Sequence, residues 1–438
     1  MRRIPARSWW AVVIVGLAGQ VAWTIENLYL NLFIYDTITD SPGAIAATVA
    51  ASAIAATLAS FVVGAWSDKV GRRRVFIAVG YVLWGVSTMA FGLVNPENAG
   101  HLLPFASAVT AAVVAIVVVD AVMSFFGSGA NDAAFNAWVT DITDVGNRGR
   151  VDGVLQAMPL VSMLLVFGAL DPMTQDGKWS AFLVLVGGVM VGTGLLAWFL
   201  VVDAPSHLPA EGSSLRAVAR SLRPTEVRRN PGLILTLCIL GVIGISSQVF
   251  LPFLLIYIQY SLAIEEYALV LAVVLTGSAL AGVLGGRVID RVGKSRAMIP
   301  ALALYVVGLL MMVLVRDLVP LIVAGLVLMS GFMIVSATVN ATVRDHTPAD
   351  RVGAVQGLRM VFFVLLPMVI GPSVGAAVIR GADTYYEDLG QLKQVPTAGI
   401  FTAAAVIAVL AVIPVLALRR ADAAAALAGR TSAAGIGT

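Results

Sequence analysis

Twelve long apolar stretches dominate the sequence and leave little choice of fold. Each is long enough for a helix to cross a hydrocarbon core of about 30 Å, which takes roughly 20 residues. The runs are continuous rather than alternating, which favours helices over a β-barrel. The sequence therefore predicts an all-α membrane protein with twelve transmembrane helices, at about 9–35, 43–66, 74–94, 105–140, 152–173, 179–202, 231–259, 266–287, 297–315, 319–343, 353–379 and 397–418.

A short charged sequence occurs twice, between the second and third stretches and between the eighth and ninth. Residues 64–74 read GAWSDKVGRRR, and residues 286–296 read GRVIDRVGKSR. The same offset of 222 residues aligns Glu26 with Gln248. The repeat indicates a duplicated unit and two pseudo-symmetric six-helix bundles. The predicted divisions are an N-terminal bundle at 1–202, a cytoplasmic linker at 203–230, a C-terminal bundle at 231–420 and a cytoplasmic tail at 421–438.

Basic residues cluster on one side of the predicted membrane. Both copies of the charged loop, the linker and the two termini carry most of the Lys and Arg residues, and an excess of these residues is typical of cytoplasmic loops. We therefore expect a multi-pass protein of the cell (inner) membrane with both termini cytoplasmic. The net charge of +3 is a consequence of topology and does not indicate a nucleic-acid partner.

The linker has an amphipathic pattern at Leu215, Val218 and Leu222, with arginines on the opposite helical face. Such a segment is suited to the anionic inner leaflet, although a solvated connector is an equal alternative. The expected partners are membrane lipids, a small-molecule substrate and protons, and we expect a monomer.

The charged repeat follows the pattern Gly-x-x-x-Asp-Lys/Arg-x-Gly-Arg/Lys-x-Arg, which resembles the signature loop of the major facilitator superfamily. The resemblance extends over the whole chain through the twelve stretches and the two halves. It implies two bundles that rock about a central cavity and open it alternately to each side. It also implies that helices one, four, seven and ten line that cavity.

The repeated loop is the predicted gate. Gly64 and Gly286 are expected to let helices approach closely. Asp68 is expected to pair with Arg72 and to face the positive N-terminus of a helix in the opposite half. The alternative is that these residues only fix the topology and a local turn. The gating residues that the pattern selects are Gly64, Asp68, Gly71 and Arg72 in the first copy, and Gly286, Asp290, Gly293 and Lys294 in the second.

A looser likeness connects the fourth stretch to the glycoside-pentoside-hexuronide cation symporters. Asp132-Ala133-Ala134-Phe135 followed by Ile142-Thr143 is similar to the corresponding part of that group. Those symporters hold sodium with paired aspartates in the second span, where residues 45–66 contain no carboxylate. The departure argues against sodium coupling here.

Two acids are predicted inside the hydrocarbon zone, where a carboxylate costs at least about 2.5–3.5 kcal/mol. Glu26 lies 17 residues after Trp9, and Asp132 lies nine residues before Asp141. We predict that Glu26 and Asp132 bind and release protons and couple transport to the proton gradient. The alternative is that each acid only joins helices through hydrogen bonds. Asp36, Asp120 and Asp171 are expected near the outer surface, in contact with water.

Few polar residues are available to bind a solute. Amides near the acids and at repeat-equivalent sites of both halves are expected to face one cavity, and aromatic rings to stack on the solute. Packing between helices is the competing explanation for each of them. The substrate-binding candidates are Trp23, Asn27, Asn131, Asn136, Gln248, Tyr257 and Asn340.

The sequence gives no sign of an enzyme. His101, His207 and His346 lie in predicted loops without metal-ligand spacing, and no Walker A motif is present. We expect no metal and no cofactor. The leading hypothesis is a secondary active transporter of a small organic solute, with a sugar-like substrate favoured and protons as the coupling ion. The alternatives are a proton-driven exporter of amphipathic drugs or lipids, and a non-transporting membrane receptor or scaffold.

Overall fold

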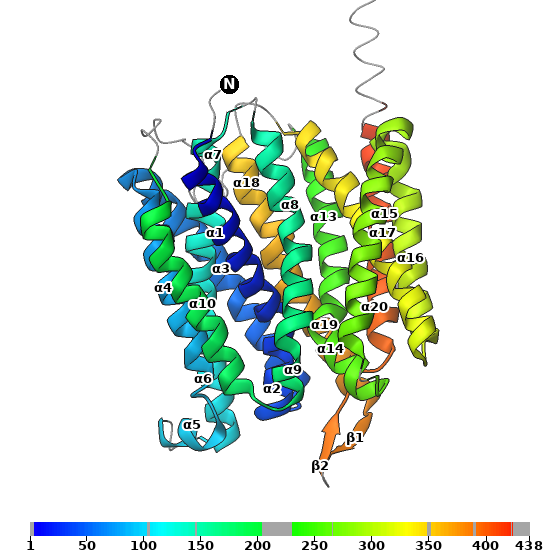
Figure 1. Ribbon diagram of the computed structural model, residues 1–438. Helices are drawn as coiled ribbons and strands as arrows, with labels where there is room; N and C mark the ends of the chain where they lie inside the picture. Colours follow the sequence, from blue (N-terminus) through cyan, green and yellow to red (C-terminus); the bar gives the residue numbers. More distant parts are fainter. Residues whose placement is uncertain are drawn as a thin grey trace, which may run out of the picture.

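A computed structural model describes residues 4–102, 106–144, 147–203, 230–264, 266–347, 352–388, 391–421 and 423 (Figure 1). Within these residues, twelve helices are long and apolar enough to cross a membrane. Each of them overlaps one of the twelve predicted stretches, so the all-α membrane fold is confirmed. Most of the linker and of the tail lies outside the described residues, and the predicted domain limits there stay predictions.

The first half contains six spans, three of them interrupted by a π-helical turn. The elements of the first three spans are α1 (Ala6–Thr24), the π turn η1 (Ile25–Tyr29), α2 (Leu30–Thr37), α3 (Pro42–Val70) and α4 (Arg73–Phe91). A short helix, α5 (Pro96–Leu102), precedes the fourth. The remaining elements are α6 (Ala108–Gly127), the π turn η2 (Ser128–Phe135), α7 (Asn136–Ile142), α8 (Arg148–Leu165), the π turn η3 (Val166–Leu170), α9 (Asp171–Gln175) and α10 (Trp179–Leu200).

The second half repeats this plan and adds a β-hairpin. Its first four spans consist of α13 (Pro231–Phe250), the 3₁₀ turn η4 (Leu251–Phe253), α14 (Leu254–Ile256), the π turn η5 (Tyr257–Ser261), α15 (Tyr267–Val292), α16 (Lys294–Leu314) and α17 (Leu318–Asp345). The last two consist of α18 (Val352–Met360), the π turn η6 (Val361–Leu365), α19 (Leu366–Ala382) and α20 (Gly399–Leu410). The twelfth span begins with α20 and continues to Ala421. Strands β1 (Tyr385–Asp388) and β2 (Gln391–Gln394) pair antiparallel between the last two spans.

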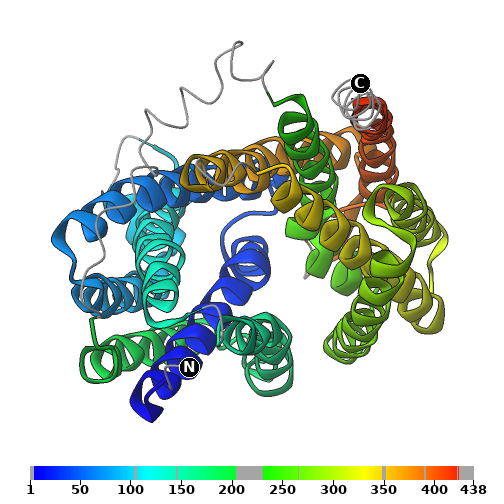
Figure 2. The same cartoon turned by 90° about the horizontal axis from the view of Figure 1, so that it is seen from above.

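The two halves lie side by side. Viewed along the helices, the blue-to-green first half occupies one side and the green-to-red second half the other (Figure 2). Their contacts run between α3 and α19, between the fifth span and α15, and between η1 and η4. We call the end that carries the N-terminus the loop end, and the opposite end, where β1 and β2 lie, the hairpin end (Figure 1).

Both copies of the charged loop turn at a glycine that no other residue replaces easily. Gly71 ends α3 with φ 67° and ψ 16°, and Gly293 links α15 to α16 with φ 91° and ψ 140°. A side chain at either position would be strained, because positive φ is costly for residues with a Cβ atom. Gly71 and Gly293 therefore have a backbone role, and their predicted part in gating stays a prediction.

Candidate functional site

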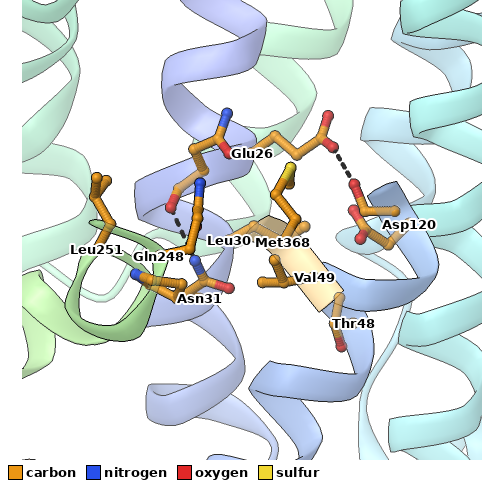
Figure 3. Close-up of a pocket in the computed structure, with 12 residues that line it drawn as sticks. Glu26, Leu30, Asn31, Thr48, Val49, Asp120, Gln248, Leu251 and Met368 are labelled. Carbon is orange, nitrogen blue, oxygen red and sulfur yellow. Dashed lines mark hydrogen bonds between the residues drawn. The ribbon is translucent and has the colours of Figure 1, made fainter. Parts of the chain in front are cut away.

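A small polar cavity lies between the two halves (Figure 3). It has a volume of about 10 Å³, which is roughly the room that one water molecule needs. The first half provides most of the polar lining, and the second half provides Gln248 and apolar side chains. The lining residues are Glu26, Asn27, Leu30, Asn31, Thr48, Val49, Ser52, Asp120, Gln248, Leu251, Pro252 and Met368. No basic residue is among them.

Glu26 is buried in this cavity, with 6% of its surface exposed. It lies in the π turn η1, and such turns often occur at functional sites because they change the direction of the side chains. The hydroxyls of Ser52 and Ser124 each lie 2.7 Å from Glu26 Oε1 and 2.7 Å from each other. Each hydroxyl has one proton, so two of these three contacts are hydrogen bonds at any moment. Among the described residues, Glu26 Oε2 has no hydrogen-bond partner.

Asp120 lines the same cavity and is 1% exposed. Its Oδ1 atom also has no hydrogen-bond partner. The expectation that Asp120 contacts water near the outer surface is wrong. The fourth span is 35 residues long, or roughly 50 Å at about 1.5 Å per residue. Asp120 can therefore be far from the cytoplasmic end of this span and still lie well inside its outer end.

Asp132 lies in the π turn η2 and is half-buried. Asn131 donates to its Oδ1 atom at 3.1 Å, and the side chains of Ser128 and Trp23 are within hydrogen-bonding reach. The Tyr81 hydroxyl in turn lies 2.9 Å from Asn131 Oδ1. The structure thus brings three predicted site residues together from the first and fourth spans.

The other candidates fall in different places. Asn27 and Gln248 join Glu26 in the cavity. Asn136 is exposed and donates to the Asp132 carbonyl oxygen at 3.1 Å, one turn away. Asn340 donates to the Ser336 carbonyl oxygen at 2.8 Å, while its own Oδ1 atom is buried without a partner.

Tyr257 does not line the cavity. It is 2% exposed and packs against Phe401, with 5.2 Å between the ring centroids. Because Phe401 is itself fully buried, the Tyr257 ring belongs to the core of the second half in this conformation.

A row of polar side chains along the fourth span connects the acids. Asp120, Ser124, Ser128 and Asp132 follow each other at intervals of four residues, which places them on one helical face. Two serines of α3 pack against this row. Ser52 contacts Ser124 and Ser60 contacts Ser128, each with 2.7 Å between the hydroxyl oxygens. We call these four serines the serine ladder.

The serine ladder and Asp120 are functional candidates that the sequence reasoning missed. The signal that would have found them is the four-residue spacing of polar residues inside an apolar stretch. In the second stretch, Thr48 and Ser52 have the same spacing, and Ser60 follows eight residues later, which is twice that spacing. Single serines and threonines are common in membrane helices, so the pattern is informative only when two such rows are compared.

The first charged loop forms ion pairs within its own half. Arg73 pairs with Asp68 and, at 3.3 Å, with Asp141 at the end of α7, and it donates to Ser67 Oγ at 2.6 Å. The predicted partner of Asp68, Arg72, is exposed instead. The left-handed turn at Gly71 explains the difference, since it reverses the chain and makes Arg73 the first residue of α4. Asp68 therefore pairs with Arg73 and not with Arg72.

The second loop has a similar contact. Lys294 pairs with Asp345 at the end of α17 at 2.6 Å, and Asp345 is the repeat counterpart of Asp141. The side chain of Asp290 lies outside the described residues. A Cβ atom on Gly64 would meet Ala133 only at an ordinary 3.7 Å, and one on Gly286 would meet nothing within 4 Å. The predicted close helix approach at these two glycines is therefore absent in this conformation.

At the hairpin end, Asp171 joins the two halves. Its Oδ1 atom accepts hydrogen bonds from Tyr29 of the first half and Tyr267 of the second, both at 2.7 Å. Gln175 donates to its Oδ2 atom at 2.6 Å. Asp171 is 1% exposed, so the expectation of water contact is wrong for this residue, because Tyr267 at the start of α15 covers it.

Two further hydrogen bonds cross between the halves at this end. The Tyr260 hydroxyl donates to Asp36 Oδ1 at 2.7 Å, and the backbone N–H of Gln394 donates to Asp40 Oδ2 at 2.6 Å. The Tyr260 ring also packs on Tyr35, with 5.0 Å between centroids. The hairpin end is therefore closed.

Comparisons with known proteins agree with this architecture. The family model described as Major Facilitator Superfamily matches residues 11–264 and 237–435. No curated protein matches the chain significantly. The likeness to solved structures is at the level of the fold, because sequence identities are low.

Three solved structures illustrate that likeness. A single-residue variant of the nucleoside transporter NupG has a TM-score of 0.71 at 12% identity, covering 94% of this chain and 99% of its own. A bacterial homologue of the human lysosomal transporter Spinster, inward-facing and unoccupied, has 0.65 at 15%, covering 95% and 98%. The xylose transporter XylE from E. coli, in a partially occluded inward-open conformation, has 0.65 at 14%, covering 92% and 96%. The chain belongs to the major facilitator superfamily.

Proposed function

We propose that this protein is a secondary active transporter that moves a small polar organic solute, coupled to protons, by alternating access. The observation that carries the proposal is the set of three acids in the first half, Glu26, Asp120 and Asp132, in spans that otherwise consist mainly of apolar residues. Acids inside a membrane are costly and mark ion or substrate pathways. A transporter also fits the closed hairpin end, because alternating access requires one end of the molecule to be closed while the other is open.

The solute class follows from the groups that line the cavity. Asn27, Asn31 and Gln248 place amides from both halves around one space, and amides hydrogen-bond to hydroxyl groups. Trp23, beside Asp132, offers a ring face for a sugar or a base. The similar solved structures include transporters named for nucleosides and for xylose. A sugar-like or nucleoside-like solute is the class that these groups suit.

The membrane orientation is also part of the proposal. The loop end carries the excess of basic residues, which supports a cytoplasmic location by the positive-inside rule. Both termini then lie in the cytoplasm of a cell-membrane protein, which acts as a monomer without enzymatic activity. With this orientation, the conformation described here is closed toward the outside.

The first experiment identifies the solute. Purified protein is screened for thermal stabilisation by sugars and nucleosides at two pH values, since a ligand stabilises the state that binds it. Uptake of the best ligand into proteoliposomes is then driven by an imposed pH gradient. We expect the wild-type protein to accumulate the solute and to acidify the lumen, which an enclosed pH dye reports.

The decisive variant is Asp132→Asn. It is expected to abolish gradient-driven accumulation of the solute, while exchange of solute across the membrane continues in part. Asp203→Asn is a matched control, because Asp203 lies near the loop end, where it accepts a hydrogen bond from the backbone N–H of Arg74. Uptake by Asp132→Asn that keeps the wild-type pH dependence would exclude the proton role of this residue.

A second function has one observation in its favour. An apolar cavity of about 60 Å³ lies between the fifth span and the second half, and apolar residues alone line it, among them Leu28, Met163, Phe167, Phe250, Leu254 and Val270. Such a space suits the apolar part of an amphipathic drug or of a lipid. Stabilisation by amphipathic compounds and not by sugars or nucleosides, together with drug sensitivity of a strain that lacks the protein, would favour an exporter.

A further inference from the structure

Two buried acids line the same small cavity, and each has an oxygen atom without a hydrogen-bond partner among the described residues. Glu26 is 6% exposed and Asp120 is 1% exposed. Glu26 Oε2 and Asp120 Oδ1 are both buried and without a hydrogen-bond partner. Buried polar atoms are almost always paired, so two such oxygens on residues that line one cavity indicate that the two acids bind a group in common.

The surroundings of the pair restrict what that group is. Spans two, seven and eleven contribute no charged side chain to the cavity lining, and no Lys, Arg or His lines it. Asp132 is the next acid along the fourth span, 12 residues after Asp120. Two carboxylates in such a place would repel each other without a counter-charge, and burying an unpaired charge is expensive. A group that the two acids bind in common is therefore expected to bring positive charge.

We propose that Glu26 and Asp120 form one proton-binding site, in which the two carboxyl groups hold a single proton between them, directly or through one water molecule. One O–H···O contact of this kind satisfies both orphan oxygens at once. The cavity of about 10 Å³ has room for one water and not for a hydrated metal ion. The pair carries one negative charge with the proton and two without it. This inference rests on the proposed proton coupling and names the site where the proton resides.

The serine contacts explain why the remaining charge is tolerated. Ser52 and Ser124 both approach Glu26 Oε1 at 2.7 Å, on the side of the carboxyl group away from its orphan oxygen. A hydroxyl donor on Oε1 stabilises the negative charge of the singly protonated pair. The geometry thus suits a pair that keeps one negative charge and binds one proton.

Infrared difference spectroscopy of the purified protein tests the shared proton directly. Protonated carboxyl groups have a C=O band that shifts in deuterated water, and the band is followed as pH rises. The measurement uses an Asp132→Asn background, so that the third acid does not contribute. We expect one titrating band, which disappears completely in Glu26→Gln and equally in Asp120→Asn. The double variant should lose nothing more.

Asp171→Asn is the matched control. Asp171 is also a 1% exposed aspartate, but both of its oxygens have hydrogen-bond donors, from Tyr29, Tyr267 and Gln175. The band should stay unchanged in this variant. If Asp120→Asn does not fold, Glu26→Gln decides alone, because a proton held by Asp120 independently would survive that change.

Three outcomes would overturn the inference. The first is a loss of about half the band in each single variant, which means two independent protons. The second is a wild-type protein without a titrating buried carboxyl band. The third is thermal stabilisation by sodium chloride over choline chloride that Glu26→Gln abolishes, which assigns the site to sodium. Failure of the proposed function is a separate result, since a shared proton without proton-driven uptake would leave the pair as a structural element.

Discussion

The two ends of the molecule are held together in different ways. At the loop end, the ion pairs Arg73–Asp68, Arg73–Asp141 and Lys294–Asp345 each lie within one half. At the hairpin end, Asp36, Asp40 and Asp171 accept hydrogen bonds from the opposite half. Contacts within a half persist when the halves rotate against each other, whereas contacts between halves must break. The ion pairs described at the loop end can therefore persist in every state, whereas the hydrogen bonds described at the hairpin end must break when that end opens.

The largest effect is expected from breaking one hydrogen bond between the halves. Tyr267→Phe removes the bond to Asp171 from the second half with little change in volume. A hydrogen bond to a charged group contributes about 1.5–3 kcal/mol, and each 1.4 kcal/mol is about a factor of ten in an equilibrium. We expect the population with an open hairpin end to rise at least about tenfold.

Tyr29→Phe is the control for this prediction. Tyr29 donates to the same Asp171 oxygen at the same 2.7 Å, but both residues belong to the first half. Distances between spin labels at Thr37→Cys and Leu392→Cys, in a Cys238→Ser background, report the opening. Equal opening in the two tyrosine variants would show that the bond acts through local stability and not through the contact between halves.

A smaller effect is expected at the first charged loop. Arg73→Ala removes contacts to Asp68, Asp141 and Ser67, and the Arg73 side chain is only 14% exposed. The loss should lower the stability of the first half by about 1–2 kcal/mol, between the values for exposed and buried ion pairs. Thermal unfolding of the purified protein measures it. Arg73→Lys should recover part of the stability, and a rise in hairpin-end opening as large as that of Tyr267→Phe would contradict the division between the ends.

The smallest effect is expected at the second loop. The Lys294–Asp345 pair is more exposed, with 36% and 53% of the side chains accessible. Lys294→Ala should therefore cost less than about 1 kcal/mol, and the cost should shrink as salt screens the pair. Thermal unfolding at low and high salt gives the comparison. A salt-independent loss as large as that of Arg73→Ala would mean that the two copies are equivalent.

Much of this architecture was readable from the sequence, because it follows from hydropathy and repetition. The twelve spans and the two halves depend on long apolar runs, and the pairing of Glu26 with Gln248 across one cavity follows from the repeat. Depth and neighbours were not readable. Asp120 and Asp171 were expected in water, because spacing along one helix does not show how far a span extends or which helix covers it.

The wrong prediction that Asp68 pairs with Arg72 has a similar origin. Arg72 occupies a basic position of the family pattern, whereas Arg73 occupies a variable one, and only the direction of the chain after Gly71 decides which of them turns back toward Asp68. The contact between Trp23 and Asp132 likewise needs the packing of the first span on the fourth. Residue types predicted the chemistry of these positions, and tertiary packing chose the partners.

All three acids and the serine ladder belong to the first half, and this has a consequence for coupling. A bundle that moves as a rigid body keeps its internal distances, so the distances between Glu26, Asp120 and Asp132 are the same whichever end is open. Only Gln248, Leu251, Pro252 and Met368 on the opposite wall are able to move away from them. Under the proposed mechanism, the hydration of the acids therefore changes with the conformation of the transporter. The residues that the second half contributes to the cavity lining control this hydration.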